Sequence, residues 1–184
     1  MKNAALALSL LLATAAAEAK TVAGVNVPDS VSVNNQTLVL NGAGLRKKFF
    51  IKVYVGGLYL ASKQSDPAAI IAADSPRRMY MSFLYGVSKD QISEAWEEGL
   101  RDNTPNASAE VKANFNKLVS WMEPIDKGKH LVFTYVPGSG TIVEVNGVAK
   151  GTLPGKATAD AIVNSWIGPK PGPGDDFKKD VLGK

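Results

Sequence analysis

The order of strand-like and helix-like segments is the feature that most restricts the fold of this chain. Strands are expected where β-branched and aromatic residues gather, over residues 37–40, 49–60, 79–85, 130–136, 141–145 and 148–153. Apolar residues at helical spacing predict two consecutive helices over residues 88–103 and 108–122, the first opened by a Ser88/Gln91 capping box. Parallel βαβ units would alternate strand and helix, so this order predicts an α+β fold with an antiparallel sheet.

Turn residues predict how these segments connect. Asn41-Gly42-Ala43-Gly44 is expected to close the first strand, with a hairpin around residues 44–48. Gly56-Gly57 indicates a bulge or a place where another part of the chain packs against the backbone. Asn146-Gly147 predicts a tight hairpin turn in a three-stranded meander. Thr158 is expected to cap a last helix, which ends at Gly168.

The N-terminus has the pattern of an export signal. Lys2 precedes an apolar stretch over residues 4–16, and Ala17-Glu18-Ala19 fits a small-x-small cleavage site. We predict a signal peptide over residues 1–19, cleaved after Ala19, and a periplasmic or secreted protein. No later stretch approaches the roughly 20 apolar residues of a spanning helix, so no membrane insertion is expected.

The remaining residues, 20–184, are expected to form a single domain. They are enough for one hydrophobic core and too few for two. Residues 169–184 are predicted to be an irregular C-terminal segment, rich in proline and glycine at its start, that includes a short turn or helix over residues 175–182.

Composition and motifs exclude several function classes. The chain has no cysteine, which excludes disulfides, thiolate metal sites and cysteine nucleophiles. Its single histidine, His130, lacks a local partner signature and is expected to be structural, so neither a metal nor a cofactor is predicted. Gly42-Ala43-Gly44 lacks the rest of a nucleotide-binding motif. The net charge of +4 is scattered, so no nucleic-acid partner is expected.

One strand carries a more specific pattern. If it runs unbroken from Arg46 to Tyr54, then positions 46, 48, 50, 52 and 54 share one face of the sheet. That face holds a guanidinium, an ammonium and a phenol beside an aromatic side chain. It lines a pocket in one interpretation and forms a solvated sheet edge in the other; spacing leaves both open.

Several segments resemble the chalcone isomerase family, in particular its bacterial chalcone isomerase-like branch. The resemblance rests on the sequences LVLNGAGLR at residues 38–46 and IKVYVGGLYL at residues 51–60, on the helix over residues 87–100, and on Ser165-Trp166-Ile167-Gly168. It implies an open-faced β-sandwich, in which helices pack on one side of a long antiparallel sheet. The family's plant enzymes close chalcones into flavanones, and relatives bind fatty acids without known catalysis.

The resemblance also implies site residues. Arg46 matches the arginine that both activities use, and Ser165 keeps the hydroxyl of a threonine in the last helix. Tyr54 stands where the enzymes have a threonine, and Ser88 and Ala95 fall near their tyrosine and asparagine. These changes count against chalcone chemistry.

Two functions follow from the resemblance. The first is a non-catalytic binder of a small amphipathic or aromatic ligand, in particular a carboxylate such as a fatty acid. Arg46 would anchor the carboxylate, and Tyr54, Ser165 and Trp166 would complete the site. The alternative is an isomerase, an intramolecular lyase acting on a phenolic or enone substrate, with Arg46 stabilising developing charge and Tyr54 or water handling the proton. The sequence leaves the oligomeric state open.

Overall fold

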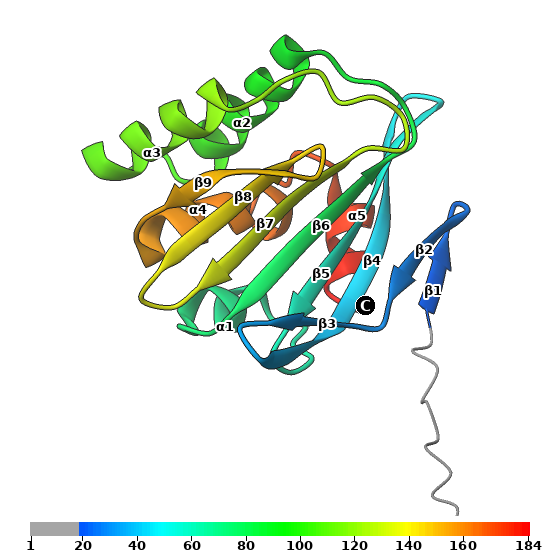
Figure 1. The fold of residues 1–184 in the computed structure, drawn as a ribbon, viewed down its shortest axis with the longest axis horizontal. Helices are drawn as coiled ribbons and strands as arrows, with labels where there is room; N and C mark the ends of the chain where they lie inside the picture. Colours follow the sequence, from blue (N-terminus) through cyan, green and yellow to red (C-terminus); the bar gives the residue numbers. More distant parts are fainter. Residues whose placement is uncertain (1–18) are drawn as a thin grey trace, which may run out of the picture.

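Seven strands form one antiparallel sheet in the order β3-β4-β5-β6-β7-β8-β9 (Figure 1). The computed structural model describes residues 19–184. The sheet contains β3 (Ser30–Val33), β4 (Gln36–Lys48), β5 (Ile51–Leu60), β6 (Arg77–Phe83), β7 (His130–Val136), β8 (Gly140–Val145) and β9 (Val148–Leu153). A separate hairpin joins β1 (Ala19–Val22) and β2 (Val25–Pro28). Every strand pairs with a sequence neighbour, which confirms the predicted antiparallel α+β arrangement.

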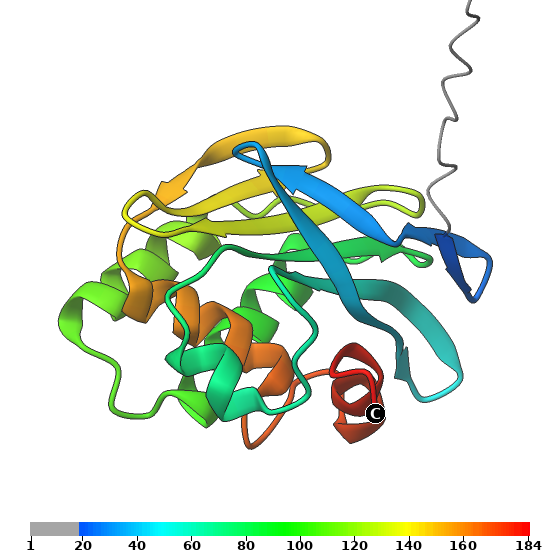
Figure 2. The same cartoon turned by 90° about the horizontal axis from the view of Figure 1, so that it is seen from below.

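Five helices lie on one side of this sheet (Figure 2). They are α1 (Pro67–Ala72), α2 (Lys89–Asn103), α3 (Ala109–Ser120), α4 (Lys156–Ile167) and α5 (Asp175–Val181). The main hydrophobic core fills the space between them and the sheet. A smaller apolar cluster on the opposite face includes Val27, Leu38 and Tyr59, where β2 and β3 cover β4 and β5.

The two central helices begin as the sequence predicts. The Ser88 hydroxyl accepts a hydrogen bond from the Gln91 amide, and the Gln91 side chain accepts one from the Ser88 amide, which completes the capping box. The last helix is different, because its N-cap is Gly155 and not Thr158. Thr158 is buried in the first turn of α4, where its hydroxyl accepts a hydrogen bond from Asn114.

The first predicted turn is wrong. The segment over residues 41–44 lies inside β4, and residues 42–44 pair with β5, while the register shifts at Asn41. The glycines serve close packing: a Cβ atom at Gly42 would lie 2.1 Å from the Asp180 carbonyl oxygen of α5. At Gly56 a Cβ atom would lie 2.6 Å from the Phe177 ring, which confirms close packing and not a bulge at that position.

Other boundaries differ more modestly. The β4–β5 hairpin turns at Phe49 and Phe50, directly after the range of residues 44–48 expected for it. Strands β1 to β3 and helix α1 were not predicted from the sequence. The C-terminal segment agrees with the prediction, because an irregular stretch as far as Gly174 leads into α5, within the turn or helix expected over residues 175–182.

The predicted signal peptide lies almost entirely outside the described residues, which begin at its last residue, Ala19. Within residues 19–184, none of the helices combines the length and the apolar character needed to cross a membrane.

Candidate functional site

A cavity of about 290 Å³ lies between the sheet and the helices. Strands β4, β5 and β6 form one wall, and helices α2 and α4 with the segment after α4 form the other. Most of the lining is apolar, and it includes Val53, Met81, Phe83, Ile92, Trp96, Leu131 and Trp166. The volume lies near the lower end of the range for pockets that hold small organic ligands.

Arg46 and Tyr54 meet at this cavity from opposite strands of one hairpin. They are directly paired in the register of β4 and β5, and both line the cavity. Arg46 is half-buried, and it forms no ion pair or side-chain hydrogen bond with any residue of the described range 19–184. A half-buried guanidinium without an anionic partner is suited to binding an anionic group from outside the protein.

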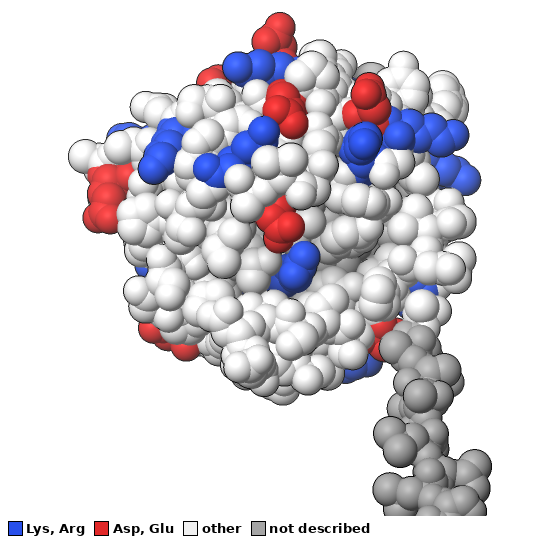
Figure 3. Space-filling view, viewed as in Figure 1, with Lys and Arg blue, Asp and Glu red and all other residues white. Residues whose placement is uncertain are grey.

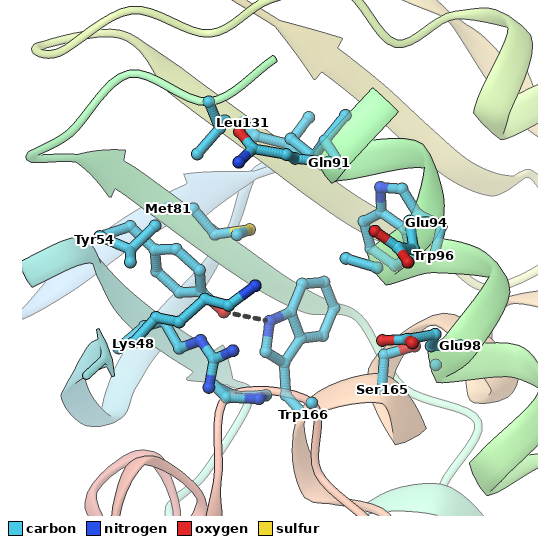
Figure 4. A pocket seen from close by; sticks show the side chains of 18 of the residues that line it. Lys48, Tyr54, Met81, Gln91, Glu94, Trp96, Glu98, Leu131, Ser165 and Trp166 are labelled. Atoms are coloured by element: carbon cyan, nitrogen blue, oxygen red, sulfur yellow. Dashed lines mark hydrogen bonds between the residues drawn. The ribbon is translucent and has the colours of Figure 1, made fainter. Parts of the chain in front are cut away.

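Tyr54 is held as a neutral hydrogen-bond donor. Burial raises the pKa of its phenol to about 12, although the hydrogen bond from Trp166 and the charge of Arg46 both act to lower it. Trp166 Nε1 donates to the Tyr54 hydroxyl oxygen over 3.3 Å, as the dashed line in Figure 4 shows. The Tyr54 proton has no acceptor among residues 19–184, so it is available to a ligand oxygen beside Arg46.

Two further polar groups of the cavity lining are buried without partners. Neither Trp96 Nε1 nor the Ser165 hydroxyl has a hydrogen-bond partner among the described residues. Buried donors of this kind normally find an acceptor, because leaving one unpaired costs about 1 to 3 kcal/mol. Both atoms have almost no accessible surface, so they lie within the packing behind the cavity wall.

Acidic residues lie across the cavity from the basic ones. Glu94, Glu98 and Asp102 of α2 contribute to its lining, whereas Arg46 and Lys48 come from β4. Figure 4 shows Glu94 and Glu98 on the α2 side and Lys48 beside Tyr54 on the opposite side. This separation favours a single orientation for an anionic ligand group, toward Arg46 and away from α2.

The prediction that residues 46, 48, 50, 52 and 54 lie on one face of a single strand is wrong, although Arg46, Lys48 and Tyr54 do line the cavity. Arg46 and Tyr54 are cross-strand partners because the chain reverses at Phe49 and Phe50. Phe50 is fully exposed at the turn and lies outside the cavity lining, as does Lys52.

All four residues predicted for ligand binding, Arg46, Tyr54, Ser165 and Trp166, line the cavity; their role in binding stays a prediction. Of the other two positions compared with the plant enzymes, Ala95 lines the cavity and Ser88 caps α2 outside it. Sequence reasoning missed the unpaired Trp96 indole. Its place on the apolar face of α2 was visible in the sequence, but the absence of a partner was not.

His130 lies away from this cavity. Its Nδ1 is 2.9 Å from the Tyr80 hydroxyl oxygen, and the centres of the two rings are 5.1 Å apart with a tilt of 31° between their planes. Within residues 19–184, the structure brings no group of three or more metal-ligating side chains together.

A curled antiparallel sheet with helices on one side and a cavity between the layers defines an open-faced β-sandwich, the class of the chalcone isomerase-like fold. A sequence model described as chalcone isomerase-like matches residues 19–183. The chain belongs to the chalcone isomerase-like family.

A solved structure supports the fold independently. A fatty-acid binding protein of Arabidopsis thaliana superimposes with a TM-score of 0.66 at 19% sequence identity. The match covers 86% of this chain and 92% of that protein. No curated protein matches the sequence. At this identity the structural likeness establishes the shared architecture.

Proposed function

We propose that this protein is a non-catalytic binder of a small amphipathic carboxylate, such as a fatty acid. The observation that carries the proposal is that, among residues 19–184, Arg46 has no anionic partner and the Tyr54 hydroxyl donates to no other group, and the two meet at a mostly apolar cavity. The guanidinium holds a carboxylate through two parallel hydrogen bonds, and the neutral phenol donates a third. The acyl chain lies against Met81, Phe83 and the indole rings. The structural neighbour described as a fatty-acid binding protein supports this choice of ligand.

Isothermal titration with laurate and methyl laurate tests the proposal. The two ligands share a chain length, and only laurate carries a carboxylate, so laurate is expected to bind more tightly. Arg46→Ala is expected to weaken laurate binding by about 30-fold or more, because truncating one partner of a buried charge pair costs about 2 to 5 kcal/mol.

Lys47→Ala is the matched control. It removes an exposed positive charge next to Arg46 that is not part of the cavity lining, so laurate affinity should stay within about twofold of the wild type. Equal binding of laurate and methyl laurate, or wild-type affinity in Arg46→Ala, would contradict the proposal.

The alternative is an isomerase or intramolecular lyase acting on a phenolic or enone substrate. The adjacent Arg46 and Tyr54 hydroxyl favour it, since they can stabilise an enolate-like oxygen. A phenol with a pKa of about 12 is a poor base at neutral pH, which counts against proton abstraction by Tyr54. Loss of chalcone absorbance at a rate proportional to protein concentration would support the alternative; we expect no acceleration.

We also propose that the protein works in the periplasm or outside the cell, after removal of residues 1–19. Support comes from the basic, apolar and small-residue regions of the N-terminus. N-terminal sequencing of protein from an envelope fraction is expected to start at Lys20. Retention of the first 19 residues would contradict this localisation.

A further inference from the structure

The tip of the β4–β5 hairpin, residues 47–52, has a composition unlike the rest of the surface. Its sequence is Lys-Lys-Phe-Phe-Ile-Lys. Phe49 is 87% exposed, and Phe50 is fully exposed. Five large apolar side chains are exposed within residues 19–184, and four of them, Phe49, Phe50, Ile51 and Tyr85, lie at this tip or on the loop beside it. The tip projects from the edge of the molecule (Figures 1 and 2).

The tip contradicts several rules of hairpin stability. Phe49 has a φ of 55°, a left-handed conformation that favours glycine or asparagine and strains a bulky residue. Lys47 and Lys52 are direct cross-strand partners, and like charges at such positions are destabilising. Residues that lower the stability of their own turn or strand, and gain no contact in return, are typical of functional positions.

The charges of the tip are also unpaired. Lys47, Lys48 and Lys52 are all exposed, and none forms an ion pair within the described part of the chain. Figure 3 shows basic side chains gathered at the upper right, where the hairpin ends in Figure 1, with acidic side chains beside them. Exposed lysines on both sides of exposed aromatic side chains complement an anionic lipid surface.

The tip is continuous with the mouth of the cavity. Lys48 and Ile51 belong both to the tip and to the cavity lining, and Tyr85 lines the cavity from the adjacent loop. A membrane bound at the tip would therefore face the cavity entrance.

We propose that the hairpin tip is a docking site for an anionic lipid bilayer, in which Phe49 and Phe50 enter the interface and the three lysines bind headgroups. A protein partner fits less well, because a stable interface buries about 800 Å² on each side and involves more than 20 residues. A two-residue turn offers far less area, whereas interfacial insertion needs only a few aromatic side chains. The proposal requires no spanning segment, and it does not depend on the identity of the cavity ligand.

Vesicle co-sedimentation tests the proposal. The full mature protein is expected to bind vesicles of equimolar phosphatidylcholine and phosphatidylglycerol, and to bind phosphatidylcholine alone much more weakly. Added salt is expected to reduce the binding. The double variant Phe49→Gly/Phe50→Asn should lose about tenfold or more in affinity. Of the two turn residues only Phe49 has a positive φ, and glycine is preferred at such a first position, so the variant should fold at least as stably as the wild type.

Two further variants separate charge from apolar contact. Lys47→Thr/Lys52→Thr replaces a repulsive pair by a favourable cross-strand pair and should also lose about tenfold in affinity for the anionic vesicles. Val148→Thr removes an exposed apolar side chain elsewhere on the surface and should bind as the wild type does.

Failure of the wild type to bind the anionic vesicles, or equal binding by the Gly-Asn variant, would overturn the proposal. So would concentration-dependent dimerisation in light scattering that the Gly-Asn variant abolishes, because the tip would then contact a second copy. Titration of that variant with laurate, without vesicles, should match the wild type. A failure of membrane docking is thus distinguishable from a failure of carboxylate binding.

Discussion

At the scale of single residues, the site depends on the hydrogen bond that Trp166 donates to Tyr54. The indole donates to the phenol oxygen, which occupies an acceptor position and directs the phenol proton elsewhere. Because the pKa of Tyr54 is about 12, the phenol stays protonated across the physiological range. Tyr54 can therefore donate to an anion without itself titrating.

Tyr54→Phe isolates this donor. Laurate affinity is expected to fall about tenfold, since a hydrogen bond to a charged acceptor is lost, and stability to fall by about 1 kcal/mol, because the Trp166 indole loses its acceptor. Tyr59→Phe is the matched control: that hydroxyl donates to the Pro28 carbonyl, outside the cavity, so laurate affinity should not change. Titration calorimetry and urea unfolding measure the two effects, and an unchanged affinity in Tyr54→Phe would argue against the donor role.

His130 predicts a pH dependence of stability. Partial burial and the nearby Lys129 lower the pKa of His130 in the folded protein. The unfolded chain then binds more protons near its ordinary pKa of about 6.5, so this contribution to stability is present above that pH and is lost as the pH falls. From about pH 7.5 to about pH 5.5, the melting temperature of the wild type should fall more than that of His130→Gln. Parallel falls in the two proteins would contradict the prediction.

At the scale of elements, glycines on β4 and β5 allow α5 to pack directly against the backbone of these strands. The chain of α5 approaches so closely at Gly42 that a methyl group there would overlap backbone atoms, which cannot rotate away. Phe177 of the same helix lies over Gly56 and contacts the Tyr54 ring edge-on at 5.6 Å. The helix therefore supports the site residue from behind.

Gly42→Ala is expected to reduce the free energy of unfolding by about 2 to 3 kcal/mol, because α5 must move to admit the methyl group. Gly86→Ala is the matched control, since its nearest atom would be 3.9 Å from the new Cβ; its change should stay within about 0.5 kcal/mol. Urea unfolding measures both. Similar stabilities for the two variants would show that α5 accommodates the methyl group without cost.

At the scale of the whole molecule, Arg77 links parts of the fold that are distant in sequence. Arg77 is 4% exposed, and its guanidinium forms an ion pair with Asp160 of α4 at 2.5 Å. The same guanidinium donates a hydrogen bond to the Ile70 carbonyl of α1 and lies 4.8 Å from the centre of the Tyr135 ring. Lys156 also contacts Asp160, at 2.7 Å. One buried guanidinium thus connects β6 with β7 and with two helices.

Arg77→Ala is expected to reduce the free energy of unfolding by about 3 kcal/mol, near the low end for a broken buried pair, because Lys156 still neutralises Asp160. The neighbouring Arg78 is a matched control: it is partly exposed and lies 3.7 Å from Glu144, so Arg78→Ala should cost about 1 kcal/mol or less. Chemical denaturation measures both. Equal costs would contradict the central role assigned to Arg77.

Much of the architecture could be predicted from local patterns. The capping box at Ser88, the meander around Asn146-Gly147 and the two amphipathic helices depend on neighbours within a few residues, so their signals are present in the sequence. Helix α1 is short, and β1 to β3 are only four residues each, so periodicity within them is too brief to be distinctive.

The sequence by itself determined the longer helices and most of the sheet strands, because capping, alternation and helical spacing are local, and its family resemblance identified Arg46. Only the tertiary structure decided the role of Gly42 and Gly44. A tight turn requires glycine, and so does a strand that packs closely against a helix, so the residue type alone does not distinguish the two. The tertiary structure also decided how Arg46 meets Tyr54, because a hairpin reversal pairs residues that alternation placed along one strand. The unpaired state of Trp96 and Ser165 depends on every atom around them, which no local pattern records.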